Sequence, residues 1–199
     1  MKTLKIWVLC LLLGTVWDVC LARDLKQNKD TTTKVASVDG PYVLYDETGR
    51  MRVIHVDEHG VLQDRVYDEV PEGFKLNVVS QKGGHRFQVK LHPVERPLWK
   101  SGQREKTLII SDPHGDLESF VSVLRNNGVI GKNYKWKFGK NQVIVIGDVF
   151  DRGKDVLPIF WLMYKLEQEA KDAGGVMTFM LGNHEEMVLR GNLKYTRSK

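Results

Sequence analysis

The chain repeats one pattern three times, and this repetition constrains the fold more than any other feature of the sequence. In each copy, a short apolar run leads through a glycine-containing polar loop into apolar residues spaced three and four positions apart. The apolar runs are residues 107–111, 142–148 and 176–181. Strands that alternate with helices predict an α/β fold with a parallel sheet. Each helix is a right-handed crossover that brings the next strand into the sheet in the same direction as the one before.

The individual elements of this repeat can be predicted from the same spacing. Residues 107–111, TLIIS, are almost continuously apolar, which predicts a strand that is buried on both faces. Helical spacing follows over residues 117–124 and again over residues 156–170, where Gly174 and Gly175 should end the second helix. The third apolar run leads into another helical stretch.

Each of the three loops carries side chains that bind metal ions. The carboxylate, imidazole and amide groups concerned are those of Asp112, His114, Asp148, Asp151, Asn183 and His184. The carboxyl ends of parallel strands meet at one edge of a sheet, which is where ligands collect in open α/β folds. We therefore expect these six side chains to converge on one site.

An earlier stretch, DEHG at residues 57–60, repeats the Asp-x-His-Gly spacing of residues 112–115 in a different setting. It lies between two runs of β-branched and aromatic residues, as does DETG at residues 46–49. Both stretches predict hairpin turns in which the Asp accepts hydrogen bonds from the turn backbone and the Gly adopts a positive φ. We therefore expect His59 to be a turn residue without a metal.

The region before the repeats divides into two parts. Residues 23–40 are polar and threonine-rich without apolar periodicity, which predicts a linker. Residues 41–100 contain short strand-like runs separated by turn residues, which predicts an antiparallel β meander. The repeats follow as a further domain over residues 105–199.

The first 22 residues have the pattern of a secretory signal peptide. A basic start precedes the apolar run of residues 6–17, which is too short to span a bilayer. Cys20 and Ala22 lie at the two positions that a signal peptidase reads, so we expect cleavage after Ala22 and a secreted or periplasmic protein without a stable membrane span. Both cysteines, Cys10 and Cys20, would leave with the signal, which excludes a cysteine nucleophile from the mature chain.

The net charge of the chain is only weak evidence for an anionic macromolecular partner. The formal charge is +5 and the pI is about 9.1, but no block of five or six basic residues occurs. We therefore expect no nucleic-acid partner.

Three sequence motifs resemble those of a known family. S-D-P-H-G, G-D-V-F-D-R-G and G-N-H-E, in this order, are similar to the signature motifs of the calcineurin-like metallophosphoesterases of the phosphoprotein-phosphatase type. The two sequences SDPHG and LGNHE together are most similar to those of the bacterial, Shewanella-like branch. The resemblance implies that the β meander is followed by the first half of a calcineurin-like sandwich.

The resemblance also implies roles for individual residues. Asp112 and His114 would bind a first metal ion, Asp148 would bridge two metal ions, and Asn183 would bind the second. His184, paired with Asp151, would be the proton donor, and Arg152 would hold the phosphate. The implied substrate is a phosphorylated protein or a small phosphomonoester.

The chemistry of phosphomonoester hydrolysis is consistent with these residue types. Two cations neutralise the dianionic substrate and lower the pKa of a shared water, which then attacks phosphorus. Carboxylate oxygens and imidazole nitrogens suit Mn, Fe or Zn, and the sequence does not distinguish among these metals. A planar arginine fork such as that of Arg152 can contact two phosphate oxygens.

Each residue also has a purely structural interpretation. Asp112 could be a helix N-cap, and Asp148 with Asp151 could cap the next helix. Arg152 could be a solvated surface charge and His184 a core histidine. We assign three further acidic residues to favourable positions in first helical turns: Asp116, Glu185 and Glu186.

The sequence also departs from the family pattern. Ser111 replaces the usual Gly, and Leu181 stands where the eukaryotic serine/threonine enzymes have an Arg. In the family, two further histidines from beyond G-N-H-E bind the second metal, whereas this chain ends at Lys199 and its other histidines, His55, His59, His85 and His92, precede the first motif. The competing interpretation is therefore a truncated, inactive copy that binds at most a metal or a partner. Nucleic-acid hydrolysis is a third, weaker alternative, which the resemblance implies because the wider superfamily includes diesterases.

Overall fold

The structure is a computed structural model that describes residues 37–81, 84–96, 100 and 102–196. The predicted signal peptide, residues 1–22, and most of the predicted linker lie outside the described residues. The linker prediction was wrong at its end, because the first strand, β1 (Asp39–Tyr45), already begins at Asp39. Within the described residues, no helix has the length and apolar character needed to cross a membrane.

The N-terminal half is antiparallel, as the sequence predicts, but it forms two sheets rather than one meander. β1 pairs with β2 (Met51–Val56), and β2 pairs with β3 (Leu62–Tyr67). A separate hairpin consists of β4 (Lys75–Val79) and β5 (Arg86–Lys90). The chain between β3 and β4 contains proline and glycine, Pro71 and Gly73, and leaves the first sheet before β4 begins.

The two predicted hairpin turns are confirmed. Asp46 Oδ1 accepts hydrogen bonds from the backbone N–H groups of Thr48 (2.9 Å) and Arg50 (3.0 Å), and Asp57 Oδ1 accepts those of His59 and Val61 (both 2.9 Å). The closing glycines have φ of +86° and +75°. Hydrogen bonds to the ionised carboxylate, first among them that of the Thr48 hydroxyl, lower the pKa of Asp46 to about 2. His59 is thus a turn residue.

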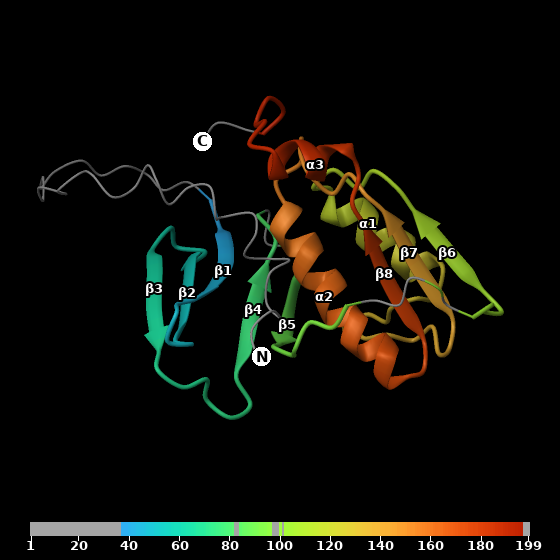
Figure 1. The fold of residues 1–199 in the computed structure, drawn as a ribbon, viewed down its shortest axis with the longest axis horizontal. Helices are drawn as coiled ribbons and strands as arrows, with labels where there is room; N and C mark the ends of the chain where they lie inside the picture. Colours follow the sequence, from blue (N-terminus) through green and yellow to red (C-terminus); the bar gives the residue numbers. More distant parts are fainter. Residues whose placement is uncertain (1–36, 82–83, 97–99, 101, 197–199) are drawn as a thin grey trace, which may run out of the picture.

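The C-terminal half is the predicted α/β unit. Its elements in chain order are β6 (Thr107–Ile110), α1 (Leu117–Asn126), β7 (Gln142–Ile146), α2 (Val156–Asp172), β8 (Val176–Met180) and α3 (Asn183–Leu189). The three strands form a parallel sheet in the order β6-β7-β8 (Figure 1). All three carboxyl ends therefore lie at the same edge.

The two faces of the parallel sheet differ in burial. Val143 and Val145 on one face are fully buried in the core that α1 and α2 share with the sheet. On the other face, the side chains of Ile109, Ile146 and Met180 are 60%, 46% and 53% exposed. The prediction that the first strand is buried on both faces was wrong, because β6 is an edge strand with one open face.

Helix α2 joins the two halves of the molecule. Figure 1 shows it between the N-terminal sheets and β8, and it contacts strands of both halves. The buried indole N–H of Trp161 on α2 donates a hydrogen bond to the carbonyl of Pro41 in β1 (2.8 Å). A second connection runs through the buried His85, which directly precedes β5. Its ring nitrogens lie 2.8 Å from Tyr134 Oη and 2.7 Å from Glu118 Oε2 on α1. The N-terminal half is thus packed onto the helices that follow the site loops.

Candidate active site

The three loops at the carboxyl ends of β6, β7 and β8 are bound directly to one another. The N–H of Asp112 in the first loop donates to the carbonyl of Gly147 (3.3 Å), and the N–H of His114 donates to that of Asp148 (2.9 Å). In return, the N–H of Gly153 in the second loop donates to the carbonyl of His114 (2.8 Å). The first two motifs therefore form one hydrogen-bonded unit.

Glycines allow the close approach between these loops. A Cβ on Gly115 would lie 2.7 Å from the carbonyl carbon of Gly153. A Cβ on Gly147 would collide with the backbone of Gly182 in the third loop, and Gly147 also has a φ of +89°. The glycines of all three motifs are thus required by backbone packing around the site.

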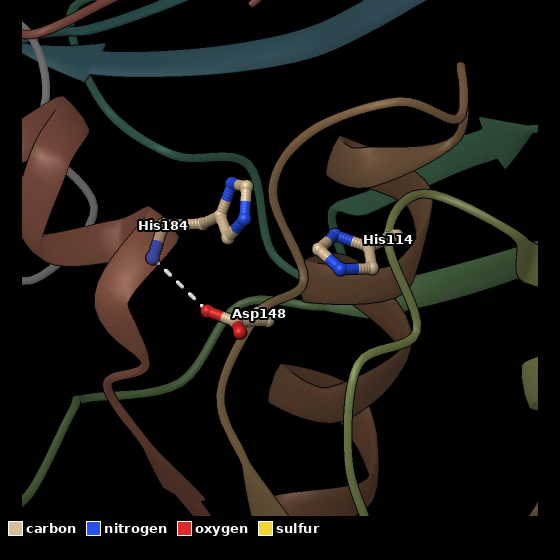
Figure 2. Close-up of side chains that lie close together, drawn as sticks. All are labelled: His114, Asp148 and His184. Carbon is tan, nitrogen blue, oxygen red and sulfur yellow. Dashed lines mark hydrogen bonds between the residues drawn. The ribbon is translucent and has the colours of Figure 1, made fainter. Parts of the chain in front are cut away.

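Three predicted site residues come together at this edge. His114 after β6, Asp148 after β7 and His184 on α3 each offer a ligand atom, and these atoms all lie within 4.8 Å of one another. Figure 2 shows the two imidazole rings with the Asp148 carboxylate below them. The predicted convergence is therefore observed for residues from all three loops.

The hydrogen bonds of His114 orient its ring for binding a cation. Its Nδ1 lies 2.6 Å from the carbonyl oxygen of Phe150, which can only accept, so Nδ1 carries the proton. The lone pair is consequently on Nε2, the nitrogen that lies 3.7 Å from Oδ1 of Asp112. A backbone carbonyl that fixes the tautomer in this way is the usual support of a metal-binding histidine.

His184 and Asp151 form the pair that the sequence predicts. His184 Nδ1 lies 3.0 Å from Asp151 Oδ2, and both residues are buried. The backbone N–H of His184 also donates to Oδ1 of Asp148 (3.0 Å), drawn as the dashed line in Figure 2. The side chains of Asp148 and Asp151 do not cap α2, because Asp155 occupies its N-cap position.

The remaining predicted residues lie at the rim of this cluster. The side chain of Asp112 is exposed, and the N-cap of α1 is Asp116, so the capping interpretation of Asp112 is wrong. Asn183 is the exposed first residue of α3, next to His184. Arg152 is also exposed and makes no hydrogen bond or ion pair within the described part of the chain.

Unusual backbone conformations concentrate at these loops. Five non-glycine residues of the described chain have a φ in the left-handed region, and four of them are predicted site residues. These are Asp112, His114, Asp148 and Arg152, with φ between 41° and 63°. Strained residues of this kind persist where the surrounding structure holds them, which is typical of functional sites.

Glu185 has a role that the sequence prediction missed. Its carboxylate accepts hydrogen bonds from the backbone N–H groups of Asp148 (2.7 Å), Val149 (2.8 Å), Phe150 (3.0 Å) and Gly182 (2.8 Å). The residue lies in the first turn of α3, as predicted, but it is only 2% exposed and bonds to another loop, so a favourable charge at a helix start does not describe its whole role. Glu185 joins the second loop to the third and thereby positions Asp148 relative to His184.

The donor set fits a divalent transition-metal ion. It combines the unprotonated Nε2 of His114, carboxylate oxygens, and the amide oxygen of Asn183 at the rim. Such a mixture of nitrogen and oxygen ligands suits Mn, Fe or Zn. Glu185 would support the site from outside, as hydrogen-bonded neighbours of metal ligands do.

Comparison with known proteins agrees with this geometry. Residues 105–198 match the family model described as calcineurin-like phosphoesterase. This part of the chain is a calcineurin-like metallophosphoesterase domain. The family and the relatives named below are phosphatases, which are hydrolases.

Two curated relatives carry the name Shewanella-like protein phosphatase. The chain is 39% identical over 95 residues to Shewanella-like protein phosphatase 2 of Arabidopsis thaliana, covering 24% of that protein. It is also 39% identical over 95 residues to Shewanella-like protein phosphatase 1 of Plasmodium berghei, covering 26% of it. The chain therefore spans about a quarter of the length of these relatives.

A solved structure shares the fold of both halves of the chain. The cold-active protein tyrosine phosphatase solved at 1.1 Å superposes with a TM-score of 0.61 at 29% identity. The superposition covers 81% of this chain and 46% of that one. The antiparallel N-terminal part and the parallel sheet of this chain both belong to the common fold.

Proposed function

We propose that this metallophosphoesterase domain hydrolyses phosphomonoesters, carried by a phosphorylated protein or a small molecule, in a site that holds two divalent metal ions. The observation that carries the proposal is the convergence of His114, Asp148 and His184 from three separate loops. The names of the relatives, which are protein phosphatases, support the substrate class.

Residues of all three loops would hold the metal ions. Asp112, His114 and Asp148 provide a first position, and Asp148 with Asn183 provides part of a second. When bound, such a pair of ions supplies a water of lowered pKa and charge stabilisation for the phosphoryl oxygens. The chain spans less than half of the length of its structural relative. The complete set of metal ligands is therefore proposed here rather than observed.

The His184–Asp151 pair would protonate the leaving oxygen. Asp151 Oδ2 lies 3.0 Å from Nδ1 of His184, and this contact fixes the orientation of the ring. Nε2, the other ring nitrogen, is then the one that can give its proton to the alkoxide or phenoxide that departs. Arg152, exposed and unpaired in the described chain, can contact two phosphate oxygens with its guanidinium.

The test measures phosphate release from p-nitrophenyl phosphate at saturating Mn²⁺. We expect His184→Asn to lower kcat by about 10²- to 10⁴-fold, the usual contribution of a positioned acid, without loss of bound metal. His59→Asn, in the hairpin turn, is the matched control and should be unchanged. If the unmodified chain with bound metal releases no phosphate above the rate in buffer, the proposal fails for this polypeptide.

Export is a separate part of the proposal. It is supported by the basic start, the apolar run of residues 6–17 and the small side chains before Arg23. The intact mass of exported protein should correspond to a chain that begins at Arg23. A mature form that retains Cys20 would contradict the assigned cleavage position.

A further inference from the structure

Tyr195 lies against the proposed proton donor. The centroid of its ring is 5.4 Å from that of His184, and the two ring planes are inclined by 46°. His184 is 7% exposed, whereas Tyr195 is 48% exposed. Tyr195 thus covers part of the His184 ring while leaving much of its own surface accessible.

The segment that carries Tyr195 is held in place after α3. The N–H of Asn192 donates to the carbonyl of Met187 (2.8 Å), and the N–H of Thr196 donates to that of Leu193 (3.1 Å). This turn lies above α3 in Figure 1, on the side of the molecule where the site loops end. The ammonium of Lys194 lies 5.0 Å from the ring centroid of Tyr195. The aromatic ring is therefore presented at the site by an ordered turn.

The position of Tyr195 indicates which part of a substrate it would contact. If His184 protonates the leaving oxygen, as proposed above, the carbon group attached to that oxygen must lie beside the His184 ring. An exposed aromatic ring at this place offers an apolar face to the leaving group. Aromatic rings bind other aromatic rings in tilted or offset arrangements, with a gain beyond simple burial of area.

We propose that Tyr195 is a specificity-determining residue that binds an aromatic leaving group, so that the site prefers aryl phosphomonoesters, such as phosphotyrosine, over alkyl ones. The preference rests on the proposed function because it assumes that the leaving group lies next to His184. Tyr195 acts through its ring, so its hydroxyl is not required.

The test measures binding with phosphonates that cannot be hydrolysed. Phenylphosphonate and methylphosphonate are titrated by calorimetry into the Mn²⁺-loaded chain and into three variants, Tyr195→Ala, Tyr195→Phe and Leu193→Ala. We expect the unmodified chain to bind phenylphosphonate more tightly. Tyr195→Ala should lower this preference by roughly three- to tenfold, whereas Tyr195→Phe should keep it. Leu193, which is exposed on the same turn, controls for general loosening of the segment.

Several outcomes would overturn the inference. Equal affinity of the unmodified chain for the two phosphonates, no binding of either, or an unchanged preference in Tyr195→Ala would each do so. Equal losses in Tyr195→Phe and Tyr195→Ala would exclude a role of the ring itself. Phosphate release from phosphotyrosine and phosphoserine peptides is measured in parallel. A phenyl preference that depends on Tyr195, found without any phosphate release, would contradict the proposed function and leave the aromatic contact standing.

Discussion

Two neighbouring glutamates show how much the role of a residue depends on its surroundings. Glu185 is buried and accepts four backbone hydrogen bonds, whereas Glu186 is exposed and pairs with Arg190 on its own helix. Replacing Glu185 by Gln puts an NH2 group against N–H donors and leaves some of them unsatisfied. We expect Glu185→Gln to lower the free energy of unfolding by about 2–4 kcal/mol.

Urea denaturation measures this difference, and Glu186→Gln is the matched control. Because the Glu186 pair is solvated, its loss should change the free energy of unfolding by less than about 1 kcal/mol. If the two variants lose the same stability, Glu185 does not hold the second and third loops together.

A second residue-scale prediction concerns the two copies of Asp-x-His-Gly. His114 has its Nδ1 proton held by Phe150, which leaves Nε2 for a metal, while His59 lies in a solvated turn. We expect His114→Ala to weaken Mn²⁺ binding by at least about 10- to 100-fold, the range found even for residues that only support a ligand. His59→Ala should bind as the unmodified chain does. Metal titration decides, and equal losses in both variants would refute the distinction.

The sequence predicts some of these residues better than others. His184, Asp151 and Asp148 could be predicted because motif, strand end and residue type all agree. Glu185 could not, because an acidic residue in a first helical turn has a sufficient local explanation. Its actual role depends on backbone donors from residues more than thirty positions away in the chain. Only the packed fold brings these groups to the carboxylate.

At the scale of elements, the cap of α1 fixes the end of the first site loop. Asp116 accepts a hydrogen bond from the N–H of Ser119 (3.1 Å) and another from its hydroxyl (2.7 Å). We expect Asp116→Ala to lower the free energy of unfolding by about 0.5–2 kcal/mol, as the loss of an N-cap does. Thermal denaturation followed by circular dichroism measures the change. Asp172→Ala, at the exposed end of α2, is the control and should change stability by no more than about 0.5 kcal/mol.

The strands and helices themselves were largely predictable, whereas their grouping was only partly so. Alternating or continuous apolar runs specify strand or helix locally, and the β-α repeat specifies parallel pairing. The split of the N-terminal strands into two sheets was not predicted. Each hairpin has similar turn chemistry, and the sequence does not show that β3 and β4 stay unpaired. The sequence also did not predict that β6 is buried on one face only. Its position at the edge of the sheet depends on which other strands and helices pack beside it, and the residues of β6 alone do not specify this.

At the scale of the whole molecule, the open face of the parallel sheet exposes large apolar side chains. Ile109, Ile146 and Met180 come from all three strands, and the register places Ile146 beside Met180. Contiguous exposed apolar side chains of this kind promote association of protein chains. The 199-residue polypeptide should therefore self-associate through this face.

Threonine at all three positions tests this expectation, because its β-branched side chain suits a strand while exposing less apolar surface. We expect the triple variant to sediment as a smaller species than the unmodified chain at the same concentration, with little change in circular dichroism. The control carries Leu62→Thr and Val66→Thr on β3, where the two residues are 62% and 57% exposed but lie in the N-terminal sheet. If the control reduces association as much as the triple variant does, exposed apolar area in general is responsible. If neither variant does, the open face of the parallel sheet is not an association surface.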